Sequence, residues 1–336
     1  MSQFLESLNS QLSAHENEGR LSPKTRQLLY GFCSRYMNEL QRDLSSDSKL
    51  EEEVQELMKF YMERVLEQES APFSFGVTHA KRREPFDHYV FGNALIGNMV
   101  ADAKLIGKEY LEEMEAQLER GENVILLANH QSEADPHALS FLLQNEFSRM
   151  ASTMVFVAGE RVLKDPLAVP LSLGRDLLCI YSKKYIDTPP ELRAHKIEHN
   201  HRALQELEKM LKAGGLCLYI APNGGRDRPN AEGIYEVAEF DAQNIEMLTL
   251  IAKRAATPTH FYPLALKTYE ILPPPQSRLL EIGEERYISR GFVGAHFGAE
   301  LCLEPTQTLT VKEKKAAREE RAREIHQIVV DLYQTI

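Results

Sequence analysis

The chain has 336 residues, a formal net charge of −11 and a hydrophobic content of 43%. This length suits one large domain, or one domain with a smaller second one, and the apolar content is ordinary for a soluble protein. The negative charge argues against a general nucleic-acid binder, because neutralising phosphates requires a basic face. It leaves room for a local basic patch that meets an acidic partner.

The sequence indicates no membrane-spanning segment and no secretory signal. Its longest apolar runs have about six residues, whereas a span needs about 20. The N-terminal residues are too acidic for a transit peptide. We expect a bacterial cytoplasmic protein, or a plastid stromal protein whose transit peptide has been removed. The cysteines fit no zinc site and predict buried, reduced thiols at Cys33, Cys179, Cys217 and Cys302.

The first part of the chain has the periodicity of helices. One helix is expected from Ser22-Pro23 to about Leu40 and another from Leu50 to Glu69, each with an apolar stripe along one face. Such stripes are more often core than membrane-binding surface. We therefore predict an N-terminal helical bundle over residues 1–75.

After about residue 85, strand-like apolar runs alternate with helical stretches. The expected strands cover residues 124–128, 153–158, 177–181, 216–221, 261–266 and 300–303. The expected helices cover residues 109–120, 137–147, 196–213, 234–255 and 310–334. This alternation predicts an α/β domain over residues 76–336, with a mixed, largely parallel sheet flanked by helices.

A polar segment follows the strand expected at 124–128, and it reads Asn129-His130-Gln131-Ser132-Glu133-Ala134-Asp135-Pro136. A histidine paired with a carboxylate can take a proton from an alcohol, because the carboxylate fixes the imidazole tautomer and stabilises the imidazolium. The structural alternative is that Asp135-Pro136 caps and begins a helix. The two interpretations are compatible.

A second polar loop follows the strand expected at 216–221, and it carries Gly224-Gly225 with Arg226 and Arg228. Two arginines on a tight glycine loop can clamp a phosphate, although both could instead pair with Asp227. A base and a phosphate clamp at two strand ends indicate an enzyme that acts on a hydroxyl of a phosphorylated small molecule.

These two segments, together with residues 157–162, 174–184 and 262–266, resemble the soluble plastid-type glycerol-3-phosphate acyltransferases. The blocks occur in family order, and the likeness runs from about residue 72 to about residue 303. The resemblance implies a helical bundle that leads into an α/β domain. It also implies transfer of a fatty acyl group from acyl carrier protein or coenzyme A to the sn-1 hydroxyl of glycerol 3-phosphate.

Residue by residue, the resemblance makes His130 the base and Asp135 the carboxylate that orients it. Lys184, Arg226 and Arg228 match the positions that hold the phosphate. A thiolate is a good leaving group, so we expect no covalent acyl-enzyme, no metal and no cofactor. The alternatives are a non-catalytic module that binds phosphoglycerol or carrier protein, and an acyltransferase for a related lysophospholipid.

Two further residues are candidates for substrate contact. Tyr185 stands where the plastid enzymes have a histidine of the phosphate pocket, so its hydroxyl could donate a hydrogen bond without adding charge. Arg161 follows an expected strand, and its alternative is a salt bridge to Glu160 or Asp165.

The donor and the product suggest two surfaces. The stretch 183–212 is locally basic, and we expect Arg193, Lys196 and Arg202 to steer an acidic acyl carrier protein. Because the chain has no membrane segment, contact with a membrane is expected only at its periphery, where the lipid product is released.

Overall fold

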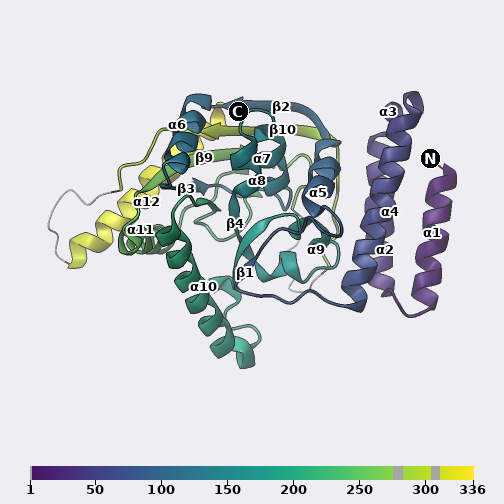
Figure 1. Ribbon diagram of the computed structural model, residues 1–336, viewed down its shortest axis with the longest axis horizontal. Helices are drawn as coiled ribbons and strands as arrows, with labels where there is room; N and C mark the ends of the chain where they lie inside the picture. Colours follow the sequence, from purple (N-terminus) through teal and green to yellow (C-terminus); the bar gives the residue numbers. More distant parts are fainter. Residues whose placement is uncertain (1, 275–282, 304–310) are drawn as a thin grey trace.

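The computed structural model describes residues 2–274, 283–303 and 311–336. Helices at the N-terminus lie at one end of the molecule, beside a sheet covered by helices (Figure 1). The N-terminal helices are α1 (Ser2–Asn17), α2 (Pro23–Glu39), α3 (Gln41–Ser46) and α4 (Ser48–Ser70). The α2 helix begins where the Ser-Pro pair predicts, since the Ser22 hydroxyl accepts a hydrogen bond from the Thr25 backbone N–H at 3.1 Å.

The N-terminal helices share a hydrophobic core with the α/β part of the chain. The Tyr36 hydroxyl donates to the carbonyl of Leu95 at 3.0 Å, and the Tyr61 hydroxyl donates to the carbonyl of Leu167 at 2.7 Å. Both tyrosines are fully buried in one cluster with Leu95 and Leu167. The division into two domains at residue 75 stays a prediction.

The sheet has the strand order β1-β5-β4-β6-β3-β9-β10-β2. Its strands are β1 (Thr78–His79), β2 (Val100–Ile106), β3 (Asn123–Ala128), β4 (Val155–Gly159), β5 (Asp176–Ile180), β6 (Cys217–Ile220), β9 (Thr259–Lys267) and β10 (Gly291–Phe297). The five central strands, in the spatial order β5-β4-β6-β3-β9, pair in parallel. The pairs β1–β5 and β9–β10 are antiparallel. The predicted mixed, largely parallel sheet is therefore confirmed.

Helices cover both faces of this sheet. Two separate apolar clusters form because alternate residues of β3 point to opposite faces: Val124 and Leu126 to one, Ile125 and Leu127 to the other. One face packs against α6 (Lys108–Glu119), α7 (Asp135–Leu143) and α8 (Ser148–Thr153). The other packs against α10 (Arg193–Ala213), α11 (Ala242–Ala255) and α12 (Val311–Gln334). The shorter α5 (His88–Gly97) and α9 (Val169–Ser172) lie beside the N-terminal helices.

Two expectations about elements and one about a cysteine were wrong. Residues 300–303 form no strand, since Leu301 makes only one backbone hydrogen bond to β9, from its N–H to the carbonyl of Phe261. The helix expected from residue 234 begins at Ala242, because β7 (Arg228–Pro229) and β8 (Tyr235–Glu236) form a hairpin first. Of the four cysteines, Cys302 is exposed and the other three are buried. Residue 310 of the last expected helix lies outside the described residues.

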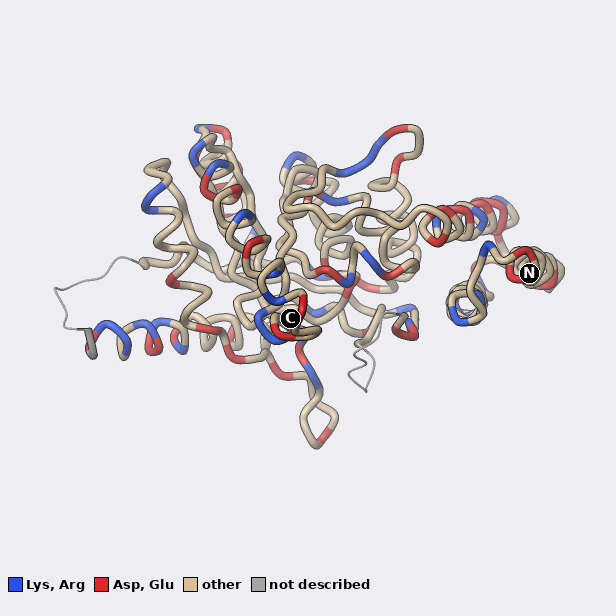
Figure 2. The backbone as a smooth tube through the Cα atoms, turned by 90° about the horizontal axis from the view of Figure 1, so that it is seen from below, with Lys and Arg blue, Asp and Glu red and all other residues tan. Residues whose placement is uncertain are grey.

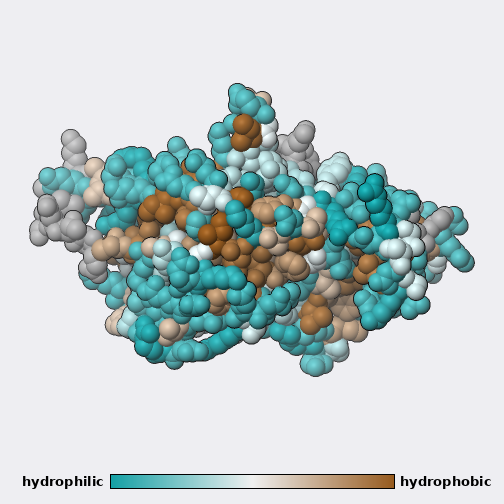
Figure 3. Space-filling view, turned by 90° about the horizontal axis from the view of Figure 1, so that it is seen from above, coloured by the Kyte–Doolittle hydropathy of each residue, from teal (hydrophilic) through white to brown (hydrophobic). Residues whose placement is uncertain are grey.

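The surface carries mixed charge and scattered apolar side chains. Basic and acidic residues alternate along α12, the helix at the left of Figure 2. Figure 3 shows apolar side chains at the surface of one face between hydrophilic regions. Among the described residues, large apolar side chains are exposed at Phe86, Val90, Leu192, Ile197, Ile234, Leu250, Tyr287 and Ile328. Among the described helices, none is both long and apolar enough to cross a membrane.

Candidate active site

The predicted site residues follow strands that run in the same direction. His130 follows β3, Arg226 follows β6, Arg161 follows β4 and Lys184 follows β5. These four strands are neighbours and parallel in the order β5-β4-β6-β3. Their carboxyl ends therefore open on one edge of the sheet, which is where α/β proteins place their ligands.

His130 and Asp135 form the pair that the sequence predicts. The His130 Nδ1 lies 2.7 Å from Asp135 Oδ2. An ionised carboxylate can only accept hydrogen bonds, so in the neutral imidazole Nδ1 carries the proton and Nε2 has the lone pair. The His130 side chain is 30% exposed while that of Asp135 is 1% exposed. The basic nitrogen thus belongs to the accessible partner of the pair.

Asp135 is held by the loop that precedes it. Its carboxylate accepts the backbone N–H groups of Gln131 at 2.9 Å and Ser132 at 3.0 Å, and it also accepts the hydroxyl of Thr268. The α7 helix does begin at Asp135-Pro136, but its capping residue is Ala134. The expectation that the Asp135 side chain caps this helix was wrong, because the carboxylate turns back to the loop instead.

The arginine loop is joined directly to His130. The backbone N–H of Asp227 donates to the carbonyl of His130 at 2.6 Å. The buried Asp227 carboxylate accepts from Asn129 Nδ2 at 2.8 Å and from the Ala238 N–H at 3.0 Å. Burial raises the pKa of Asp227 to about 6. Asp227 therefore ties the loop that carries Arg226 and Arg228 to the end of β3, a role that the sequence analysis missed.

Arg161 and Arg226 meet on a residue that the sequence analysis did not single out. Arg161 Nη1 donates to Glu284 Oε1 and Arg226 Nη2 donates to Glu284 Oε2, both at 2.7 Å. Glu160, one of the partners expected for Arg161, pairs with Lys164 at 2.9 Å. No motif marks Glu284, which lies on the connection between β9 and β10.

Further carboxylates and arginines lie next to Arg226 and Glu284. Glu133 Oε1 lies 3.8 Å from Arg226 Nη1, and Glu133 Oε2 accepts from Arg286 at 2.9 Å. Arg286 also lies 3.1 Å from Asp165. Burial alone would raise the pKa of Glu133, but Arg286 and Arg226 together hold that pKa below its ordinary value. Glu133 therefore stays ionised beside the arginines.

Lys184 and Tyr185 lie at the same edge of the sheet, in a short turn of 3₁₀ helix after β5. Lys184 is exposed, and within the described parts of the chain its ammonium makes no hydrogen bond or ion pair. Tyr185 is half-buried, and its carbonyl accepts from the Lys196 ammonium at 2.8 Å. The structure brings neither residue into contact with His130 or Arg226 in the ranges that it describes.

Of the residues expected to steer a carrier protein, Arg193 and Arg202 are exposed and Lys196 is buried. Lys196 is 2% exposed, and its ammonium donates to the carbonyls of Tyr185 and Thr188. The expectation that Lys196 contacts a partner was therefore wrong, because its charge is turned inward to hold the 183–188 turn. Arg202 is exposed, and Arg193 donates to Asp187 at 2.7 Å.

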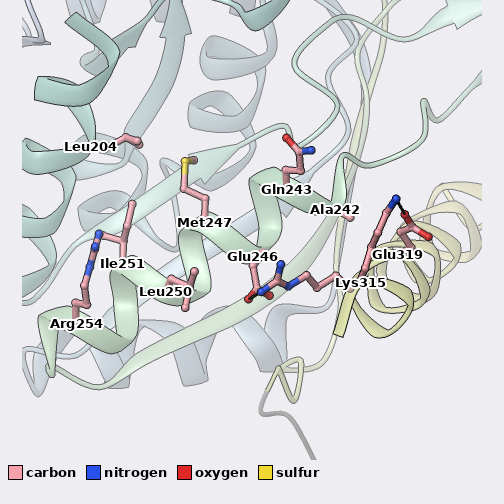
Figure 4. Close-up of a pocket in the computed structure, with 11 residues that line it drawn as sticks. Leu204, Ala242, Gln243, Glu246, Met247, Leu250, Ile251, Arg254, Lys315 and Glu319 are labelled. Carbon is pink, nitrogen blue, oxygen red and sulfur yellow. Dashed lines mark ion pairs between the residues drawn. The ribbon is translucent and has the colours of Figure 1, made fainter. Parts of the chain in front are cut away.

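A wider groove of about 660 Å³ lies elsewhere, between α10, α11 and α12 (Figure 4). Its lining is apolar at Met247 and Leu250 and charged at Glu246, which pairs with Arg318 at 3.0 Å. It contains none of the predicted site residues, and we do not assign it to the active site. Within the described residues, no group of three His, Cys, Asp or Glu side chains is arranged to hold a metal ion.

Comparisons with known proteins point to one family. An acyltransferase family model matches residues 103–267. Over 98% of its length the chain is 34% identical to a chloroplastic glycerol-3-phosphate acyltransferase of Cucurbita moschata, and it covers 72% of that protein. The chloroplastic enzyme of Arabidopsis thaliana is 33% identical over 99% of the chain and 74% of its own length. That of Pisum sativum is 36% identical over 87% of the chain and 64% of its own length.

The chain thus spans between 64% and 74% of the length of these three relatives. A solved 1-acyl-sn-glycerophosphate acyltransferase from Thermotoga maritima aligns with 73% of this chain and 77% of its own, with a TM-score of 0.42 and 18% identity.

Proposed function

The chain belongs to the glycerol-3-phosphate acyltransferase family, and on that premise we propose that it transfers a fatty acyl group from an acyl thioester to the sn-1 hydroxyl of glycerol 3-phosphate. The observation that carries this proposal is the His130–Asp135 pair at 2.7 Å, joined through a 2.6 Å backbone hydrogen bond to the loop of Arg226 and Arg228. The proposed base and two candidate phosphate ligands thus follow neighbouring strands, β3 and β6, at the same edge of the sheet.

In the proposed reaction, His130 Nε2 takes the proton of the sn-1 hydroxyl as the oxygen attacks the thioester carbonyl. The carbon–sulfur bond then breaks, and the imidazolium returns its proton to the departing thiolate. Asp135 keeps the imidazole in the required tautomer and stabilises its cation. No covalent acyl-enzyme is needed, because the acceptor oxygen attacks the donor directly.

Arg226, Arg228 and Lys184 are the proposed ligands of the acceptor's phosphate, with Arg161 and Tyr185 as further contacts. Guanidinium groups suit this role because their N–H groups pair with anionic oxygens in a fixed geometry. Positioning of the hydroxyl beside His130 then supplies much of the rate enhancement.

The donor is proposed to be acyl carrier protein or acyl-coenzyme A. For location we propose the cytoplasm of a bacterium, with the plastid stroma as the alternative. The chain's four cysteines are all free thiols, which suits a reducing compartment.

Turnover measured with several acceptors tests the proposal. The purified chain should convert glycerol 3-phosphate and either acyl donor to 1-acyl-glycerol 3-phosphate. Lysophosphatidate should be a poorer acceptor. Binding of glycerol 3-phosphate without turnover would indicate the non-catalytic module instead, and a preference for lysophosphatidate would assign the related acyltransferase.

A further inference from the structure

Glu284 occupies two of the arginines of the proposed acceptor site. Each of its carboxylate oxygens accepts one hydrogen bond of 2.7 Å, one from Arg161 and one from Arg226. The Glu284 side chain is 7% exposed and that of Arg226 is 15% exposed. One largely buried anion therefore spans two guanidinium groups.

A phosphate makes the same demand on these arginines. It offers anionic oxygens that accept charge-assisted N–H bonds from neighbouring guanidinium groups, as a carboxylate does. The Arg226 Nη2–H that points to Glu284 cannot point to a second anion at the same time. If Arg226 binds the acceptor's phosphate with this donor, Glu284 and the phosphate compete for it.

Among the described residues, the arginines around Glu284 already pair with carboxylates in the absence of a phosphate. Arg161, Arg226 and Arg286 pair with carboxylates that belong to Glu133, Asp165 and Glu284. A phosphate monoester adds a charge of about −2. Unbalanced charge in a largely buried cluster is costly. Departure of Glu284 to solvent would remove one negative charge and would free a donor on each of two arginines.

The cavity beside Glu284 is too small for a phosphate group. The cavity lined by Glu133, Arg161, Asp165, Gly283 and Glu284 measures about 10 Å³. This volume holds about one water molecule. This cavity does not admit a phosphate group while Glu284 remains in place.

The backbone at Gly283 and Glu284 is held by contacts that do not involve the Glu284 carboxylate. The Gly283 N–H donates to Asp165 Oδ2 at 2.9 Å, and the Glu284 carbonyl accepts from Arg286 Nη1 at 3.1 Å. Arg286 is itself fixed, with a side chain 4% exposed. Rotation of the Glu284 side chain would therefore break its hydrogen bonds to Arg161 and Arg226, while Glu133 stays 3.8 Å from Arg226.

We propose that Glu284 is an internal anion that occupies Arg161 and Arg226 in the acceptor-free protein and gives way to the acceptor's phosphate. This inference rests on the proposed function. It makes Glu284 a residue that sets the affinity for the acceptor by opposing it, rather than a ligand of the substrate.

The test compares Glu284→Gln with Glu285→Gln. Glu285 loses the same charge one residue away, but it is 46% exposed and pairs with Arg35, outside the cluster. Calorimetry on the full chain, without an acyl donor, gives the Kd of glycerol 3-phosphate and of inorganic phosphate. Glu284→Gln should lower both Kd values on the order of tenfold, while Glu285→Gln should leave them unchanged.

A second variant separates competition from a loss of structure. Glu284→Asp keeps the charge but is too short to reach both arginines at once, so its Kd values should fall between those of the wild type and Glu284→Gln. An unchanged or raised Kd in Glu284→Gln, with an unaltered melting temperature, would overturn the inference and make Glu284 a residue that positions the arginines. Failure of the wild type to transfer acyl groups to glycerol 3-phosphate would overturn the proposed function instead.

Discussion

His130 and Asp135 could be predicted from the sequence because a buried strand followed by a polar segment is a local signal. The structure adds what is not local. Thr268, which is distant from Asp135 in the sequence, donates a further hydrogen bond to the Asp135 carboxylate. Glu284 lies on the connection between β9 and β10 and accepts hydrogen bonds from Arg161 and Arg226. Neither residue lies in a recognisable motif, so only the folded chain reveals them.

If Arg226 and Arg228 bind the acceptor's phosphate, replacing either arginine should weaken acceptor binding. Arg228→Ala and Arg226→Ala should each weaken binding of glycerol 3-phosphate by about 1.5–3 kcal/mol, the range for hydrogen bonds to charged groups. The loss should appear mainly in KM. Glycerol, which has no phosphate, serves as the control acceptor. An equal loss with glycerol would mean that the arginines act through the structure of the loop rather than through the phosphate.

At the scale of elements, apolar runs predict the central strands well because these strands are buried on both faces, as β3 is along its whole length. The edge strand β2 could not be predicted in this way. The residues of β2 are mostly exposed, so no apolar pattern marks the strand, and its place depends on pairing with β10. The start of α11 was mispredicted because the β7–β8 hairpin is only two residues long on each side.

We expect Lys196 to stabilise the 183–188 turn, which carries Lys184, because its ammonium donates to the carbonyls of Tyr185 and Thr188. Lys196→Met keeps the length of the side chain but removes two hydrogen bonds to carbonyls. We expect a loss of about 2 kcal/mol in the free energy of unfolding, together with a raised KM for glycerol 3-phosphate. Urea denaturation and steady-state kinetics measure the two effects.

Arg193→Met is the matched control for this change. Arg193 lies on the same helix, but its ion pair with Asp187 is exposed, and such pairs contribute about 0–1 kcal/mol. Equal effects of the two substitutions would contradict the structural role of Lys196.

At the scale of the whole molecule, buried histidines set the response of stability to pH. Burial lowers the pKa of five histidines, which are the buried His79, His88, His137 and His199 and the half-buried His296. Below their ordinary pKa of about 6.5 the unfolded chain binds protons that the folded chain does not, so acid favours unfolding. The raised pKa values of Asp227 and Glu115 act in the opposite direction at lower pH, but they are two groups against five.

We therefore expect the free energy of unfolding to fall as the pH is lowered from 7.5 through 6.5 towards 5. His137 is 2% exposed, and it should contribute up to about 1.4 kcal/mol per pH unit. His137→Gln keeps an acceptor for Arg175, whose Nη2 lies 2.6 Å from His137 Nδ1, but it cannot titrate. Urea denaturation at several pH values should show a shallower slope for this variant. Identical slopes would contradict the assignment.

The proposed reaction depends most on His130 as the base, and turnover of His130→Ala tests this role most directly. With saturating glycerol 3-phosphate and acyl donor, kcat should fall roughly 10²–10⁴-fold, because general base catalysis contributes on that scale. The Kd of glycerol 3-phosphate should barely change, since the phosphate is held by other residues. Turnover near that of the wild type, in a variant that folds and binds the acceptor normally, would contradict the account.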